Sequence, residues 1–128
     1  WATFFNLLGE FNQGWVHTAA ALVVVIARKN FEHNNKPSIT HQFDAGSAWE
    51  NLALEASSRG FVAHGMEGFD YEKAQKDLGI PQDYVVLAML AIGKPAPKSV
   101  LPPQLQERET PSDRKPLKDI LMEGKFRP

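Results

Sequence analysis

The 128-residue sequence contains no cysteine, which excludes disulfide bridges and thiolate metal sites. Because this absence fits a reducing compartment, we expect a cytoplasmic protein. The sequence also lacks an excess of either charge. Its net charge of −1 offers no electrostatic basis for binding nucleic acid or an anionic membrane. The longest apolar run, residues 19–27, is far shorter than the roughly 20 residues that span a bilayer.

No methionine precedes Met66, and the sequence opens at Trp1 on a segment that is already apolar at helical spacing. We therefore expect the chain to be the later part of a longer polypeptide. Its 43% hydrophobic and 23% charged residues are ordinary for a soluble globular protein. A chain of this length can form one domain with a core of its own.

Apolar spacing predicts an alternating order of helices and strands. Apolar residues at i, i+3, i+4 and i+7 predict an amphipathic helix over residues 1–11, which the segment Asn12-Gln13-Gly14 should end. The continuous apolar runs at residues 21–27 and 84–93 predict strands, the first of them buried on both faces. This order predicts an α/β layered fold of class α+β, in which helices flank a central sheet.

The longest predicted helix covers residues 44–59, with Asp44 as its N-cap. One side of this helix carries mostly small apolar side chains, at Ala45, Ala48, Trp49, Leu52, Ala53 and Ala56. Small side chains let a helix approach its neighbour closely. The pattern therefore fits a central helix of the core and equally well an interface with a second subunit.

Residues 59–70 carry the most informative pattern of the sequence. Gly60 predicts the end of the long helix, a short strand follows it, and Gly65 and Gly68 then permit tight turning and the close approach of another group. Asp70 is a suitable N-cap for the next helix. Such a turn presents free N–H groups to an acceptor atom on a ligand, although it also serves as a plain connection.

The polar segment 28–42 predicts a loop, either a lid over a site or a mobile connection. It contains His33 and His41, and His17 and His64 stand outside it. Their spacing matches no common metal-binding motif. We therefore expect solvated or hydrogen-bonded histidines rather than a metal site.

Seven of the nine prolines lie within residues 94–128. We therefore expect a domain over residues 1–93 and an extended, proline-rich tail over residues 94–128. Within the tail, Pro116 is a suitable first residue for a short last helix, and Arg114 and Lys115 stand just before it. Two cations at a helix start can clamp a phosphate or carboxylate, although basic pairs are also common in solvated tails.

Three features in a fixed order resemble the C-terminal part of the nitroreductase family, the FMN-dependent NAD(P)H oxidoreductases. They are Asp44-Ala45-Gly46 with Asn51-Leu52 on the long helix, Met66-Glu67-Gly68-Phe69-Asp70 after a strand, and Gly93 followed by a tail that contains Arg114-Lys115-Pro116-Leu117. The resemblance extends over residues 15–126. It implies a nitroreductase-like FMN-binding fold, whose N-terminal section with further flavin contacts is absent from these residues.

The resemblance also implies which residues would hold a flavin. The turn at Met66, Glu67 and Gly68 would lie against the flavin ring with a backbone N–H near flavin N5, and Arg114 and Lys115 would bind the FMN phosphate. NAD(P)H would supply the hydride, and a small molecule such as a nitro compound or quinone would accept it. Because the cofactor carries this chemistry, no side chain is assigned as catalytic.

In the family that the sequence resembles, the helix at residues 44–59 forms much of a homodimer interface, and the tail wraps the partner subunit. The resemblance therefore implies a homodimer of this kind. An alternative interpretation is a truncated, flavin-free assembly module that dimerises through this helix and has no activity of its own. We expect neither a nucleic-acid partner nor membrane association, since charge and hydropathy give no basis for either.

Overall fold

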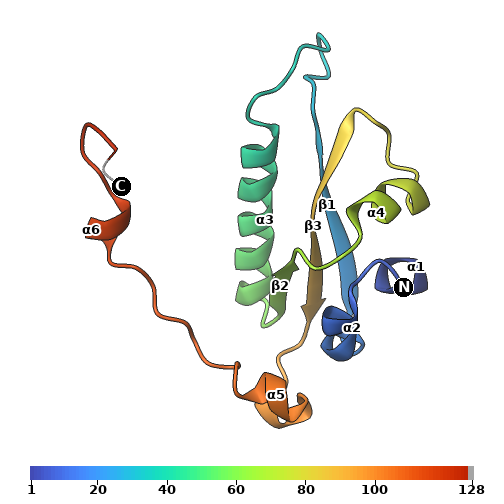
Figure 1. Cartoon of the computed structure of the whole chain (residues 1–128), viewed down its shortest axis with the longest axis vertical. Coiled ribbons are helices and arrows are strands. Elements are labelled where there is room, and N and C mark those ends of the chain that lie inside the picture. The colour runs from blue at the N-terminus through green and yellow to red at the C-terminus, as the bar shows by residue number, and fades with distance from the viewer. Residues whose placement is uncertain (127–128) are drawn as a thin grey trace. The chain divides into compact units, whose positions relative to one another are not determined.

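The chain folds as two compact units, Trp1–Ala96 and Pro97–Pro128, and the computed structural model describes residues 1–126. The first unit consists of helices packed on both faces of a small sheet (Figure 1). The predicted α+β class with a central, helix-flanked sheet is therefore confirmed. Within residues 1–126, no helix is long and apolar enough to cross a membrane.

The sheet has three antiparallel strands, β1 (Ala21–Arg28), β2 (Val62–Met66) and β3 (Tyr84–Gly93), with β3 in the centre. The strands predicted at residues 21–27 and 84–93 are confirmed, because unbroken apolar runs rich in β-branched residues suit extended backbone. The prediction that the first of them is buried on both faces is wrong. β1 is an edge strand, and most of its side chains are only half-buried.

Different helices cover the two faces of the sheet, as successive residues of β2 show. Gly65 lies against the ring of Trp49 in α3 (His41–Ser58), whereas the ring of His64 meets Trp15 edge-on, with 4.9 Å between the ring centres. Adjacent residues of a strand point to opposite faces. Consequently α3 covers one face, and the N-terminal segment that contains Trp15 covers the other (Figure 1).

The helix α3 begins at His41, before the predicted start. Its N-cap is Thr40, and the Asp44 carboxylate instead accepts a hydrogen bond from the Thr40 hydroxyl at 3.0 Å. The prediction of Asp44 as N-cap is therefore wrong, because residues 41–43 before it already have helical backbone. The loop is accordingly shorter than predicted and covers residues 29–40. The helix ends as predicted, since Gly60 adopts a φ of 75° just beyond it.

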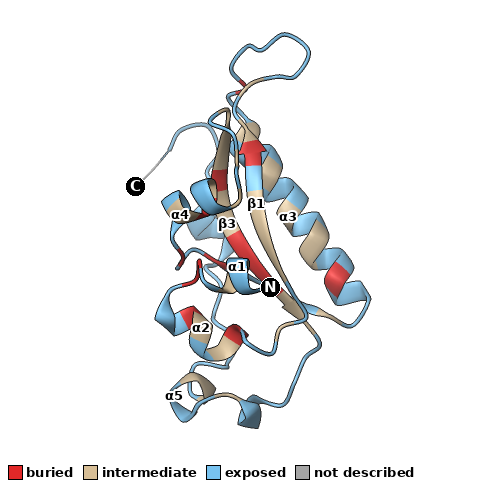
Figure 2. Cartoon of the chain, turned by 90° about the vertical axis from the view of Figure 1, so that its right-hand side faces the viewer, coloured by how far each residue is buried: buried red, intermediate tan, exposed pale blue. Residues whose placement is uncertain are grey.

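Three short helices, α1 (Ala2–Phe5), α2 (Glu10–Val16) and α4 (Tyr71–Asp77), lie on the face away from α3 (Figure 2). Their contacts with the sheet bury one hydrophobic core, formed by Leu7, Leu8, Val16, Met66, Phe69, Ala74, Val86, Met89 and Ala91. The helix predicted after the glycine turn is confirmed as α4.

The helix predicted over residues 1–11 is instead two helices, so that prediction is wrong. Between them, Leu7 and Leu8 are buried in the core, and Gly9 has an extended backbone as the N-cap of α2. The segment 12–14, predicted to end a helix, lies inside α2. Its two amide side chains donate to backbone carbonyl groups outside the helix instead of competing for the helix's own hydrogen bonds.

Up to residue 126, the second unit contains three short helical segments, η1 (Lys98–Val100), α5 (Pro103–Gln106) and α6 (Leu117–Ile120). Most of its described side chains are exposed, as expected for a proline-rich segment with little core of its own. Pro116 has an extended ψ of 145° and is the N-cap of α6. The prediction that it is the first helical residue is therefore wrong by one position.

Candidate functional site

The predicted turn follows the last residue of β2. Met66 is 4% exposed and anchors the end of the strand in the core. Glu67 and Gly68 are exposed, and the Phe69 N–H closes the turn by donating to the Glu67 carbonyl oxygen at 2.9 Å. Because Phe69 is buried again, the turn is held at both ends by core side chains. The structure thus brings Met66, Glu67 and Gly68 together on one fixed segment.

The helix α4 starts directly after this turn, with Asp70 as its N-cap, as predicted. The Asp70 carboxylate accepts a hydrogen bond from the Lys73 N–H at 2.8 Å, which satisfies one of the free donors of the first helical turn. Two further contacts tie this start to the N-terminal segment. The Asp70 N–H donates to the Leu7 carbonyl oxygen, and the Lys73 ammonium group donates to the Asn6 carbonyl oxygen, both at 2.8 Å.

The backbone of the turn offers two unused donors. The N–H groups of Glu67 and Gly68 donate no hydrogen bond to any of the residues that the structure describes. Backbone N–H groups are strong donors whose direction is set by the fold, and they do not titrate. The turn can therefore present fixed donors to an acceptor atom of a bound molecule.

The carbonyl side of the turn is held by the N-terminal segment. The Gly68 carbonyl oxygen accepts hydrogen bonds from the Gly9 N–H and from Asn12 Nδ2, both at 3.0 Å. A Cβ atom at position 68 would lie 2.8 Å from Asn12 Nδ2, so this close approach requires glycine. The close approach predicted at Gly68 is thus confirmed, and the approaching group belongs to this chain. Sequence reasoning missed Asn12, and no local signal identifies it.

Gly65 has a different role from the predicted one. It lies inside β2 opposite Leu90, so the prediction that it permits a tight turn is wrong. The group that approaches it is the Trp49 ring, at an ordinary van der Waals distance from where a Cβ would lie. Gly65 therefore belongs to the packing between α3 and the sheet.

The predicted phosphate-binding pair, Arg114 and Lys115, lies in the second unit and is exposed. The Arg114 guanidinium donates to the hydroxyl and, at 3.4 Å, to the carbonyl oxygen of Ser112. Within residues 1–126, neither Arg114 nor Lys115 forms an ion pair with an acidic side chain. Both cations therefore keep their charge available to an anion.

Three of the four histidines contact other groups of the chain, and one of these contacts is that of the His64 ring with Trp15. His41 Nδ1 lies 2.6 Å from the Ser38 carbonyl oxygen, and His33 Nε2 lies 2.8 Å from the side-chain nitrogen of Asn34. In the part of the chain that the structure describes, no group of three or more His, Cys, Asp or Glu residues is placed to hold a metal ion.

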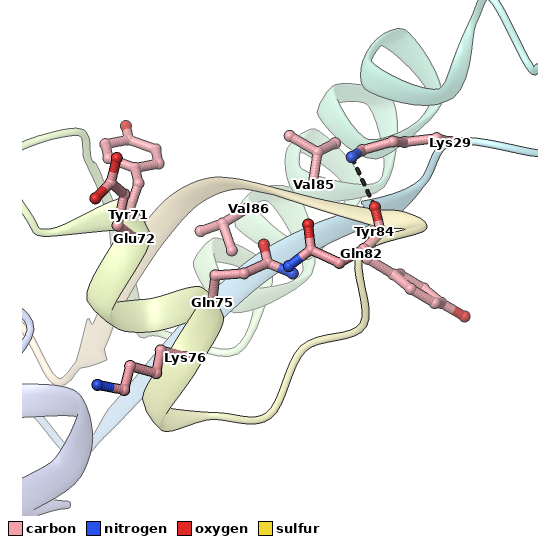
Figure 3. A pocket seen from close by; sticks show the side chains of 9 residues that line it. All are labelled: Lys29, Tyr71, Glu72, Gln75, Lys76, Gln82, Tyr84, Val85 and Val86. Atoms are coloured by element: carbon pink, nitrogen blue, oxygen red, sulfur yellow. Dashed lines mark hydrogen bonds between the residues drawn. The ribbon is translucent and has the colours of Figure 1, made fainter.

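An open groove of about 680 Å³ lies between α4 and the start of β3 (Figure 3). Two of its polar side chains already form hydrogen bonds within the chain. Lys29 Nζ donates to the Gln82 carbonyl oxygen at 2.8 Å, and Gln75 Nε2 donates to the Pro81 carbonyl oxygen at 2.9 Å. No residue of the predicted site lines this groove. The lining residues are Lys29, Tyr71, Glu72, Gln75, Lys76, Gln82, Tyr84, Val85 and Val86.

Two solved structures show which proteins share this fold and how much of their length this chain covers. An oxidoreductase containing FMN is 45% identical to this chain and superposes with a TM-score of 0.92, over 99% of this chain and 66% of its own. A nitroreductase family protein from Streptococcus pneumoniae, at 17% identity, has a TM-score of 0.69 over 96% of this chain and 74% of its own. The chain thus spans slightly less than two thirds of the FMN-containing oxidoreductase.

Sequence comparisons lead to the same family. An uncharacterized 15.4 kDa protein of Mycolicibacterium smegmatis is 31% identical over 127 residues, which are 97% of this chain and 84% of that protein. The family model described as the nitroreductase family matches residues 5–94, which is more than half of the chain. Together with the strand, turn and helix that carry Met66 to Asp70, this match shows that the chain belongs to the nitroreductase family.

Proposed function

We propose that the chain is part of an FMN-dependent oxidoreductase. The observation that carries the proposal is the pair of N–H groups of the exposed residues Glu67 and Gly68, which have no partner among the described residues on a turn held at both ends. Family membership supports it, as does the 45% identity to an oxidoreductase that contains FMN. When bound, FMN would take a hydride from NAD(P)H at N5 and pass it to a nitro compound, a quinone or a similar acceptor.

The turn would position the flavin ring. A backbone N–H of Glu67 or Gly68 would donate to N5 and so fix the ring and tune its electronics. These donors suit the task because they belong to the backbone of a turn whose ends are buried at Met66 and Phe69. No side chain of this turn needs to gain or lose a proton.

The basic pair would hold the phosphate group. Arg114 offers a planar fork of donors to phosphate oxygens, and Lys115 offers a point charge. Each charge-assisted hydrogen bond contributes about 1.5–3 kcal/mol. We therefore expect the double variant Arg114→Ala, Lys115→Ala to weaken FMN binding by about a hundredfold or more, measured by flavin fluorescence in the full-length protein.

The matched control for this experiment is the double variant Lys98→Ala, Lys125→Ala, which removes two other cations of the second unit. It should leave the FMN dissociation constant within about twofold of the wild-type value, because only general electrostatics change. An unchanged dissociation constant in the double variant of Arg114 and Lys115 would show that the pair does not bind the FMN phosphate.

A homodimer is the assembly that we propose for the full-length protein, through α3 and the proline-rich tail. Phe43 and Leu54, which are 75% and 60% exposed, support it. They lie eleven residues apart on α3, which is close to three full turns, so they project from the same side.

The same exposed side of α3 supports the alternative function, a flavin-free assembly module. Colour separates the two, since only a flavoprotein is yellow. A cytoplasmic location is also a proposal, and cell fractionation would test it.

A further inference from the structure

We propose that Asn12 is a positioning residue for the Gly68 N–H donor of the Glu67–Gly68 turn. The proposal rests on the function proposed above, because it concerns the same turn. It adds a residue from a distant part of the chain, which acts by holding the Gly68 carbonyl group.

The geometry of Asn12 leaves one orientation for its amide. Asn12 is 9% exposed, its Nδ2 donates to the Gly68 carbonyl oxygen at 3.0 Å, and its Oδ1 accepts from Trp15 Nε1 at 3.2 Å. An indole N–H can only donate and a carbonyl oxygen can only accept. The oxygen of Asn12 must therefore face Trp15, and its NH2 group must face Gly68.

Two hydrogen bonds then fix the carbonyl group of Gly68. The Gly9 N–H and the Asn12 amide both donate to its oxygen, and the Phe69 N–H donates to the Glu67 carbonyl oxygen on the other side of the turn. Glycine has the widest range of backbone conformations of any residue. The Gly68 carbonyl group shares its peptide plane with the Phe69 N–H, whose bond to the Glu67 carbonyl oxygen holds the next plane, which carries the Gly68 N–H. Without these bonds the Gly68 N–H could rotate, whereas with them its direction is set before a ligand arrives, which lowers the cost of binding.

Sterics couple the same two residues. A Cβ at position 68 would lie 2.8 Å from Asn12 Nδ2, so a side chain there must displace the Asn12 amide. Replacing Gly68 with alanine should therefore break the same contact that Asn12→Ala removes. The two changes together should have less effect than the sum of the two alone.

The neighbouring residue Gln13 provides a matched control. Its Nε2 donates to the carbonyl oxygens of Phe5 and Leu8 at 3.2 and 2.9 Å, so it makes comparable bonds from the same helix. None of these bonds reaches the turn. Gln13→Ala should remove the bonds that hold α2 to Phe5 and Leu8, while the bond from Asn12 to Gly68 remains.

The test compares Asn12→Asp, Asn12→Ala and Gln13→Ala in the full-length protein. Asn12→Asp keeps the acceptor for Trp15 but replaces the donor to Gly68 with a carboxylate oxygen. We expect both Asn12 variants to weaken FMN binding by about threefold to tenfold and to shift the midpoint potential of the flavin, because one hydrogen bond that orders the turn is lost. Gln13→Ala should leave the midpoint potential unchanged.

A second measurement needs no flavin. Hydrogen exchange of the Phe69 N–H in the flavin-free protein should become about threefold to tenfold faster in Asn12→Asp and stay at the wild-type rate in Gln13→Ala. If the Asn12 variants do not fold, Gly68→Ala gives the same readouts. Wild-type exchange and an unchanged midpoint potential in Asn12→Asp or Gly68→Ala would overturn the positioning role. If the wild-type protein fails to bind FMN, the proposed function fails, and the exchange rates still decide whether Asn12 holds the turn.

Discussion

Asp70 sets the point at which the glycine turn becomes a helix. Its carboxylate accepts the Lys73 N–H at 2.8 Å and stands at the positive end of the α4 dipole. We expect Asp70→Ala to lower the free energy of unfolding by about 1 kcal/mol, the usual cost of losing an N-cap. Urea denaturation of the full-length protein measures this.

The control for this prediction is Asp77→Ala at the other end of α4, where a carboxylate faces the negative end of the helix dipole. That change should leave the free energy of unfolding within about 0.5 kcal/mol of wild type or raise it slightly. Equal losses in both variants would show that Asp70 contributes through general charge and not through its cap.

Sequence reasoning succeeds at this scale where the cause is local. Asp70 and Gly60 were predictable because a cap or a helix stop depends on residues within about one helical turn. Asn12 was not, since its partner Gly68 lies 56 residues further along the chain. Read locally, an Asn, a Gln and a Gly in sequence indicate a break, and only the folded chain shows where the amide groups donate.

At the scale of elements, α3 is joined to the sheet through Trp49, whose ring lies against Gly65 of β2. We expect Trp49→Ala to lower the free energy of unfolding by about 2 kcal/mol or more, because a large aromatic contact is lost and a cavity remains between helix and sheet. Thermal or urea unfolding measures the change.

The control is Trp1→Ala, which removes a tryptophan side chain that is exposed and lies outside the hydrophobic core. It should change the free energy of unfolding by no more than about 0.5 kcal/mol. If Trp49→Ala is as mild as Trp1→Ala, then the contact between α3 and β2 does not stabilise the fold as we describe.

The strands β1 and β3 were predictable because uninterrupted apolar runs leave little choice of element. The division of the N-terminal segment into α1 and α2 was not predictable. The apolar spacing over residues 1–11 fits one helix equally well. What breaks that helix is tertiary: Leu7 and Leu8 enter the core, and the Gly9 N–H donates to the Gly68 carbonyl oxygen. Periodicity reports which side chains are apolar, not which backbone groups pair across the fold.

At the scale of the whole molecule, the proposed homodimer places the exposed side of α3 in an interface. Leu54→Glu should convert the full-length protein from dimer to monomer in sedimentation velocity, because a carboxylate buried without a partner is costly. Ile39→Glu is the control, since Ile39 is 95% exposed in the loop before α3. A dimer of unchanged stability in Leu54→Glu would exclude this side of α3 from the interface.

Family and fold class were predictable from the sequence because the strand, turn and helix around Glu67-Gly68 are encoded within a few residues and combine with a distant basic pair. The homodimer, the electron donor and the electron acceptor depend on surfaces between chains and on loops, and they stay predictions. Exposed apolar residues such as Phe43 and Leu54 became identifiable only when the structure showed which side of α3 faces the sheet.

The absorbance spectrum of the full-length protein, after incubation with FMN and removal of the free cofactor, shows whether the protein binds FMN. An intact mass identifies the chain present. We expect bands at about 370 and 450 nm that stay with the protein, as for bound flavin. If the full-length protein keeps these bands while residues 1–128 alone are colourless, the missing flavin contacts lie outside this chain. A folded full-length protein that remains colourless after incubation with FMN would show that the protein is not an FMN-dependent oxidoreductase.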